Sequence, residues 1–345
     1  MAPIMRALRR ESDAKVERLL ARRRPDSGAR GRVQALPRIG LRSVAILLST
    51  YNGETFLPAQ LHSFLAQTHH DWMLYWRDDG STDSSVRLLQ QFAADMSEKR
   101  CVAPTGGGCQ HITRSFLSLL RIARADTAAY FAFSDQDDVW LPEKLERGIA
   151  ALEAVPPGQP ALYCAQRIIV DSMLMRTGEP GPLRRSPSFP AALTQNVAPG
   201  CTMMLNRAAA DLILASEPPD TVWHDWWCYV IVAAAAGRIL ADPDATVLYR
   251  QHNNNRVGEP RSRWHRGIAA LRRGPQPYMR LLRQHVATLE AKPELLPDQT
   301  RSQLAVIVHG LNGGFRARLR ALRLPGFVRQ TWLETLVFRV WFLIG

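Results

Sequence analysis

The chain has 345 residues, of which 46% are hydrophobic and 22% charged, and this composition excludes both disorder throughout and a collagen-like repeat. The net charge of +13 is unevenly spread: residues 1–43 carry 12 basic and 4 acidic side chains, residues 44–255 carry 16 and 22, and residues 256–345 carry 16 and 5. A nucleic-acid binder usually carries positive charge on its folded surface, so the acidic middle argues against one. Binding of the basic ends to an anionic membrane or to RNA stays open.

The first half of the chain alternates between strand and helix patterns. A basic tail over residues 1–42, which we expect to be disordered, comes first. Short apolar runs then predict strands over residues 44–49, 72–77, 100–103 and 130–134. Amphipathic patterns predict helices over residues 54–67, 84–96, 112–123 and 141–154. This order predicts an α/β fold with a mainly parallel central sheet and flanking helices.

The second half is more mixed. Strands are predicted over residues 162–170, 201–205, 238–242 and 246–250, and a helix over residues 225–236. A folded domain is therefore expected over residues 43–258, followed by a basic helical region over residues 259–345. No apolar run is long enough to predict a transmembrane helix, and the start lacks the apolar core of a secretory signal. Five cysteines without a C-x-x-C pair indicate free thiols, as in the cytoplasm.

The sequence Asp-Gln-Asp-Asp follows the predicted strand over residues 130–134. Asp135 and Asp137 are two residues apart at a strand end, where both can face one hard cation. Mg²⁺ or Mn²⁺ takes such carboxylates and completes its shell with water and phosphate oxygens. The alternative is a solvated turn that caps the next helix. We favour the metal site, because Phe133 and Trp140 flank the cluster.

A second acidic cluster, residues 78–83 (DDGSTD), follows the strand over residues 72–77. A carboxylate in this loop could accept a hydrogen bond from a nucleobase. Asp-Gly-Ser is also common turn chemistry, so the motif alone decides little.

Asp225 stands at a predicted helix start among aromatic residues. It is either a helix cap or, desolvated by Trp223 and Trp226, a general base toward an alcohol. His252 follows a predicted strand and would suit a phosphate or metal site, although a lone histidine is more often structural.

These motifs together resemble family 2 glycosyltransferases with the GT-A fold. They stand in family order and look most like the rhamnosyltransferase-like branch that builds bacterial surface polysaccharide. The matching segments are residues 48–53 (LSTYNG), 78–83 (DDGSTD), 134–142 (SDQDDVWLP), 200–202 (GCT), 224–227 (HDWW) and 249–252 (YRQH).

The resemblance implies a role for each matching residue. The donor nucleotide would be held by Thr50, Tyr51, Asn52, Asp78, Asp79 and Asp135. Asp225 matches the catalytic base of this inverting family. The metal would be bound by Asp137 and His252, and the acceptor or donor sugar by Asp138 and Trp226. The family often has Asn-x-Gly before its third helix, whereas this chain has Thr105-Gly106-Gly107-Gly108, so donor contacts from that loop are in doubt.

The predicted function is inverting sugar transfer. The donor would be a nucleotide-diphosphate-sugar such as dTDP-rhamnose or a UDP-sugar, and the acceptor a glycan or a lipid-linked glycan. The enzyme would need Mg²⁺ or Mn²⁺, bind no nucleic acid, and lie in the cytoplasm, with peripheral contact to anionic membrane through its basic ends. Two alternatives stay open: a metal-dependent nucleotidyltransferase, and a non-catalytic membrane- or RNA-binding protein.

Overall fold

The computed structural model describes residues 42–96, 100–103, 109–219, 221–252 and 274–345. Residues 1–41 of the predicted basic tail, the glycine triplet and the predicted boundary at residue 258 lie outside these ranges. The strands are β1 (Val44–Thr50), β2 (Trp72–Asp78), β3 (Cys101–Val102), β4 (Tyr130–Ser134), β5 (Val139–Trp140), β6 (Ala161–Val170), β7 (Arg176–Gly178), β8 (Met204–Asn206) and β9 (Arg238–Arg250). The α-helices are α2 (Leu57–Leu65), α3 (Ser85–Asp95), α4 (Ile112–Ala125), α5 (Lys144–Glu153), α6 (Arg207–Ser216), α7 (His224–Ala234), α9 (Gln276–Glu290), α10 (Asp298–Asn312), α11 (Phe315–Leu322) and α12 (Trp332–Ile344).

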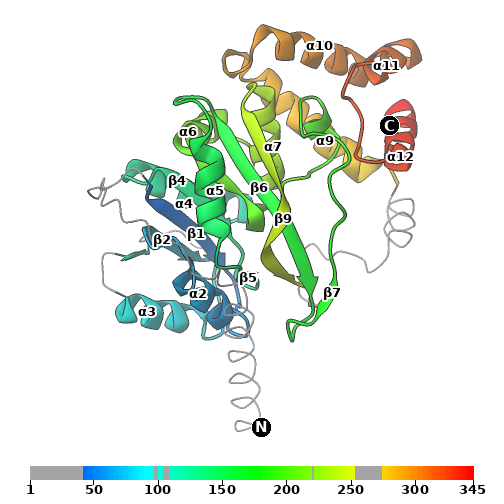
Figure 1. Ribbon diagram of the computed structural model, residues 1–345. Helices are drawn as coiled ribbons and strands as arrows, with labels where there is room; N and C mark the ends of the chain where they lie inside the picture. The colour runs from blue at the N-terminus through cyan, green and yellow to red at the C-terminus, as the bar shows by residue number, and fades with distance from the viewer. Residues whose placement is uncertain (1–41, 97–99, 104–108, 220, 253–273) are drawn as a thin grey trace, which may run out of the picture.

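One sheet runs through the centre of the molecule (Figure 1). Its strand order is β3-β2-β1-β4-β8-β6-β9-β5, and β7 pairs with β6. The strands from β3 to β4 are parallel, whereas β8, β7 and β5 pair antiparallel with their neighbours. The sheet is therefore parallel in its first half and mixed beyond it.

Parallel pairing brings the ends of the first strands to one edge. In β1, Leu48 is aligned with Ser134 of β4, and Thr50 is aligned with Asp78 of β2. The loops after these strands consequently lie next to one another. Ligands of open α/β sheets bind at such an edge.

The sheet is covered on both faces, which explains the continuous apolar run in β1. Val44, Ile46 and Leu48 pack with residues of α2, α3 and α5. Ala45 and Leu47 point to the other face and pack with residues of α4, α6 and α7. A strand buried on both faces needs apolar side chains at every position.

The structure corrects the predicted strands over residues 238–242 and 246–250. They form the single strand β9, which pairs in parallel with β6 through a register shift. Pro243 lies at this shift, between two aspartates that Arg147 binds: the guanidinium is 2.8 Å from Asp242 Oδ1 and 2.7 Å from Asp244 Oδ2. The proline is tolerated within the strand because it sits at a bulge.

The sequence analysis also missed three elements. Helix α6 and the short strands β5 and β7 were not predicted. Conversely, residues 201 and 202 of the predicted strand over 201–205 belong to a 3₁₀ turn, Gly200–Thr202, before β8. Strands of two or three residues carry too little pattern to be recognised.

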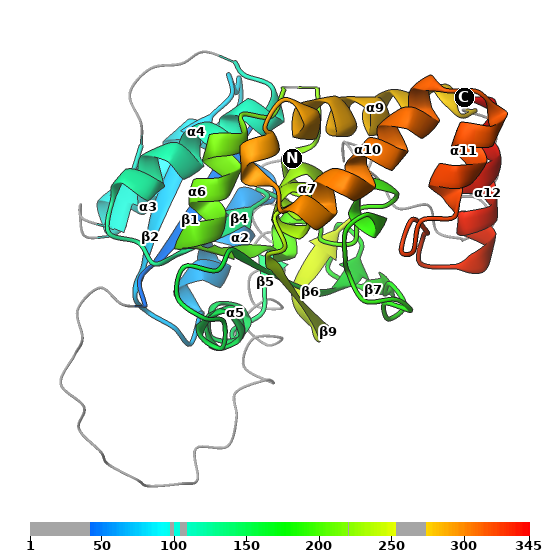
Figure 2. The same ribbon diagram turned by 90° about the horizontal axis from the view of Figure 1, so that it is seen from above.

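The C-terminal helices α9 to α12 gather at one end of the molecule, beside α7 (Figures 1 and 2). On α9, the buried ring of His285 lies 5.2 Å from Trp226 and 5.9 Å from Trp227 of α7, measured between centroids. Neither ring nitrogen has a hydrogen-bond partner among the described residues, and burial lowers the pKa of His285 to about 3. No helix of the described ranges has the length and apolarity needed to span a bilayer.

We predict that His285 makes the fold sensitive to acid. Its pKa in the folded chain lies below the value of about 6.5 expected when unfolded, so its stabilising effect is complete above about pH 6.5 and is lost as the pH falls toward 3. His285→Met should flatten the fall of unfolding free energy over this range, measured by urea denaturation. His309→Met, on the exposed side of α10, is the matched control. An unchanged pH profile in His285→Met would contradict the assignment.

Candidate functional site

Gln136 joins the loops that follow β1 and β4. Its Oε1 accepts hydrogen bonds from Thr50 Oγ1 (2.6 Å) and from the backbone N–H of Tyr51 (2.8 Å). Its Nε2 donates to the carbonyl oxygen of Tyr51 (2.9 Å). Thr50 is buried, whereas the Tyr51 side chain is 51% exposed at the surface of the site. The glutamine thus fixes a loop whose aromatic side chain stays available to a ligand.

Gly53 leaves the space that Gln136 occupies. A Cβ at residue 53 would lie 2.4 Å from Gln136 Oε1 and 3.1 Å from Thr50 Oγ1. Any larger residue would displace the amide from these hydrogen bonds. The glycine of the predicted motif is therefore explained by a close approach.

The loop after β2 is tied to the loop after β1. Asn52 donates its backbone N–H to Ser81 Oγ (2.8 Å), and its Oδ1 accepts from the backbone N–H of Thr82 (2.8 Å). Asp78 accepts from the backbone N–H groups of Gly80 and Ser81 in its own turn. The structure thus brings the predicted nucleotide-binding residues to one edge, with Asn52 and Asp78 already engaged in holding the loops.

Asp79 is also engaged. Its buried carboxylate lies 3.0 Å from the guanidinium of Arg77. A nucleobase would have to share it with this arginine, so the predicted nucleotide contact stays a prediction.

Three carboxylates crowd the end of β4. Burial and the charges of Asp137 and Asp225 together raise the pKa of Asp135 to about 7, against the lowering effect of Lys144. Burial also raises the pKa of Asp138 well above its usual range, with repulsion from Asp137 and Asp135 adding to it. The end of this strand is therefore a place where negative charge is costly without a cation.

Asp137 and His252, the two predicted metal ligands, lie in contact with one another. The Nε2 atom of His252 lies 2.9 Å from Asp137 Oδ2, and its ring packs at 4.7 Å from that of Phe56. Asp138, by contrast, is fully buried and accepts a hydrogen bond from the backbone N–H of Arg250 (3.1 Å). This placement favours a supporting role for Asp138 over the predicted sugar contact.

Lys144 stands behind the carboxylates. It is fully buried at the start of α5, with its Nζ 4.2 Å from the ring of Trp140 and without a hydrogen-bond partner among the described residues. Burial lowers the pKa of Lys144 to about 8, although nearby Cys201, Asp138 and Asp135 oppose this. A lysine here supplies one positive charge to a cluster of several carboxylates.

The carboxylates at the end of β4 fit a hard divalent cation, whereas the soft thiol of Cys201 beside them does not. Asp135, Asp138 and Cys201 each offer a ligand atom within 4.8 Å of the others, and Asp137 lies on the same loop. Carboxylates that repel one another are the ligands that Mg²⁺ and Mn²⁺ bind best, because the cation removes the repulsion. This group shares no residue with the predicted metal ligands Asp137 and His252, which contact one another instead.

Asp225 lies in the first turn of α7, where the helix dipole favours a carboxylate. Its Oδ2 accepts hydrogen bonds from Asn196 Nδ2 (3.0 Å) and from the backbone N–H of Gly200 (3.2 Å). Its Oδ1 accepts from the backbone N–H of Trp226 (2.7 Å). Since its charge raises the pKa of Asp135, the two carboxylates act on one another. The structure thus brings the two predicted functional groups into one site.

Trp226 is largely committed to packing. Its Nε1 donates to the carbonyl oxygen of Ala192 (2.7 Å), and its ring contacts His285. Only the exposed part of the Trp226 side chain is accessible to a sugar, and the sugar contact stays a prediction.

Gln136, Lys144 and Asn196 were missed as functional candidates. The sequence contained an indication for Lys144, because a cation in the first turn of a helix is unfavourable unless nearby acidic residues stabilise it. It contained no such indication for Asn196, since this residue lies in a loop 29 residues before Asp225, to which it donates a hydrogen bond.

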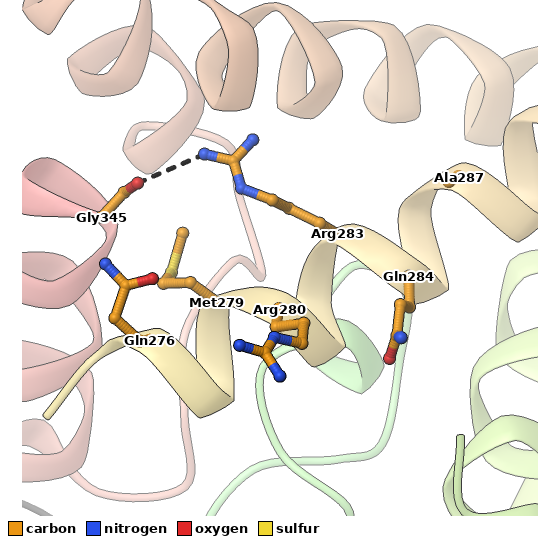
Figure 3. A pocket seen from close by; sticks show the side chains of 7 residues that line it. All are labelled: Gln276, Met279, Arg280, Arg283, Gln284, Ala287 and Gly345. Atoms are coloured by element: carbon orange, nitrogen blue, oxygen red, sulfur yellow. Dashed lines mark hydrogen bonds between the residues drawn. The ribbon is translucent and has the colours of Figure 1, made fainter. Parts of the chain in front are cut away.

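A separate cavity of about 400 Å³ lies between α9 and the end of the chain (Figure 3). Arg283 donates to the carbonyl oxygen of Gly345 at its rim (3.3 Å). None of the predicted site residues lines this cavity. Its lining comprises Gln276, Met279, Arg280, Arg283, Gln284, Ala287 and Gly345.

This chain, with acidic residues at the strand ends of an α/β sheet, is similar to known glycosyltransferases in sequence and in fold. The family model described as glycosyl transferase family 2 matches residues 45–211. The predicted resemblance to this family is thereby confirmed over these residues, which make up slightly less than half of the chain. Asp225 and His252 lie beyond the matched residues.

Individual relatives agree with this assignment. The dTDP-rhamnosyl transferase RfbG of Shigella flexneri is 26% identical over 223 residues, which cover 61% of this chain and 73% of RfbG. The UDP-Glc:alpha-D-GlcNAc-diphosphoundecaprenol beta-1,3-glucosyltransferase WfgD of Escherichia coli is 29% identical over 109 residues, or 32% of this chain and 40% of WfgD. The predicted likeness to rhamnosyltransferases is thereby confirmed.

The fold is shared with a solved glycosyltransferase structure. Residues 1–349 of S. aureus TarS, in complex with UDP-GlcNAc, superpose with a TM-score of 0.54 at 14% identity, covering 81% of this chain and 78% of that one. The predicted α/β GT-A fold with a helical C-terminal region is confirmed.

We predict that Gly53 and Gln136 act as one unit. Gly53→Ala and Gln136→Ala should each reduce the unfolding free energy by about 1–3 kcal/mol, since each breaks the same hydrogen bonds. The double variant should cost little more than Gln136→Ala alone, because the alanine then has space. Gly314→Ala, where an added Cβ meets nothing within 4 Å, is the control. Additive costs in chemical denaturation would show that the two residues are independent.

Proposed function

We propose that this chain is an inverting glycosyltransferase that moves a sugar from a nucleotide-diphosphate-sugar to a glycan or lipid-linked acceptor in bacterial surface polysaccharide synthesis. The observation that carries the proposal is the position of Asp225 beside the acidic end of β4, held by Asn196 and Gly200. A base and a diphosphate site next to each other are what displacement at an anomeric carbon requires.

The donor is proposed to bind over the loops after β1, β2 and β4. Thr50, Tyr51 and Asn52, with Asp78 or Asp79, would surround the nucleotide. RfbG is named for dTDP-rhamnose, so we propose this donor first and a UDP-sugar second. WfgD is named for an acceptor linked to diphosphoundecaprenol, which supports a lipid-linked acceptor.

The diphosphate is proposed to leave beside the carboxylates. Asp135 and Asp137 would hold Mg²⁺ or Mn²⁺, with His252 next to them. The bound cation would neutralise the charge of the departing diphosphate. Lys144 would keep its positive charge behind the same cluster.

The acceptor is proposed to react on the opposite side of the sugar. A neutral hydroxyl is a poor nucleophile, so a carboxylate within hydrogen-bond reach must take its proton during attack. Asp225 would do this, while Asn196 and the backbone N–H of Gly200 keep its Oδ2 in place. Attack from the face opposite the nucleotide inverts the anomeric configuration.

The two alternatives left by the sequence gain no support. A nucleotidyltransferase and a non-catalytic membrane- or RNA-binding protein would not account for the match to glycosyl transferase family 2. We therefore retain sugar transfer alone.

We predict that Asp225→Asn keeps donor binding and lowers turnover by about a hundredfold or more, because the amide cannot accept the proton. Donor binding is measured by calorimetry and turnover by release of the nucleotide. Asp211→Asn, which breaks a surface ion pair with Arg124, is the matched control. Near-normal turnover in Asp225→Asn, or a product of retained configuration, would refute the role.

We also predict a requirement for a divalent cation. Excess EDTA should abolish transfer, and added Mg²⁺ or Mn²⁺ should restore it. Asp137→Ala should abolish transfer while the melting temperature shows a folded protein. The control is Asp95→Ala, on the exposed side of α3. Full activity in EDTA would disprove the requirement.

A further inference from the structure

Helix α12 presents an apolar face to the outside of the molecule. Its inner side chains, among them Phe338 and Phe342, are buried in the core of the C-terminal helices. A surface helix normally carries polar residues on its other side. Here the outer side chains are apolar and largely exposed: Trp332 (72%), Leu333 (52%), Leu336 (51%), Val340 (47%) and Ile344 (68%).

These side chains form one continuous stripe. Residues 332, 336, 340 and 344 follow one another at intervals of four, which places them on one face of a helix, and Leu333 lies beside them. Arg339, at the edge of the stripe, is the only charged side chain exposed along α12. The other charged residue, Glu334, is used in a capping box with Thr331 at the helix start.

Segments that carry exposed arginines contact α12 and the residues just before it. Helix α11 lies beside α12 (Figure 2), and Arg318 donates to the carbonyl oxygens of Phe342 (3.3 Å) and Leu343 (2.7 Å) in the last turn of α12. Before the start of α12, Gln330 Oε1 accepts hydrogen bonds from the backbone N–H groups of Arg184 and Arg185, two exposed residues of the loop after β7. The exposed arginines of these segments and of α12 itself are Arg184, Arg185, Arg316, Arg320, Arg323 and Arg339.

We propose that α12 docks on an anionic lipid bilayer. The apolar stripe would lie below the head groups, parallel to the membrane plane, and the arginines would contact lipid phosphates. Thirteen residues are too few to span a bilayer, so the helix lies in the interface. A second copy of this chain is a poorer occupant, because two such faces would bring their arginines against one another.

The docking surface lies next to the candidate base. Gln195 accepts a hydrogen bond from the backbone N–H of Gln330 (3.0 Å) and donates to Glu334 of α12 (3.4 Å). The next residue, Asn196, donates to Asp225. If the proposed function holds, a lipid-linked acceptor would therefore reach Asp225 from the membrane to which α12 binds.

The test is co-sedimentation of the full chain with phosphatidylcholine vesicles, with and without phosphatidylglycerol. The wild-type chain should bind the anionic vesicles, and salt should weaken this binding. Leu336→Glu/Val340→Glu should lower the partition coefficient by about tenfold or more, because two charges replace buried apolar surface. Both positions are exposed, so the fold and transfer to a soluble acceptor should be unchanged.

The matched control is Leu65→Glu/Ile122→Glu, which places the same charges at exposed apolar positions of α2 and α4 (45% and 37% exposed). It should bind vesicles like the wild type. Arg316→Gln/Arg320→Gln should reduce the preference for anionic lipid.

Three results would overturn the proposal. These are no binding at low salt, equal binding by the α12 variant and the wild type, and a dimer in light scattering that the α12 variant dissociates. Because vesicle binding needs no catalysis, loss of sugar transfer alone would count against the proposed function and leave the docking surface intact.

Discussion

Repulsion among carboxylates is the constraint on which the site depends. Asp135, Asp137 and Asp138 follow one strand, and Asp225 faces them from α7, so that burial and mutual repulsion raise the pKa of Asp135 to about 7. Such an arrangement is unfavourable for folding, and it persists because the sheet and α7 hold it in place. A cation would relieve it, which links the geometry of the strand ends to a diphosphate ligand.

The surrounding residues make this arrangement possible. Lys144 brings one buried positive charge, and the backbone N–H of Arg250 satisfies one oxygen of Asp138. Gln136, which separates two of the aspartates in sequence, turns away from them and fixes the loop after β1. One tetrapeptide therefore supplies the acidic cluster and also holds the loop proposed to bind the nucleotide.

The sequence predicted those parts of the site that are set by short segments of the chain. The apolar run of β1 and the acids after β2 and β4 are such features, because parallel strands bring their ends together. The bond from Asn196 to Asp225 could not be predicted, since a loop brings it into place over 29 residues. The continuity of β9 through Pro243 was not predicted, because it depends on a bulge that Arg147 holds from α5.

The central claim is that the strand-end loops bind a nucleotide-diphosphate-sugar. The most direct measurement is a thermal-shift panel of such donors, including dTDP-rhamnose and UDP-sugars, each with Mg²⁺ or Mn²⁺. The account predicts that one donor raises the melting temperature in a concentration-dependent way, and that Tyr51→Ala weakens this shift. A panel in which no donor stabilises the folded protein with either cation would contradict it.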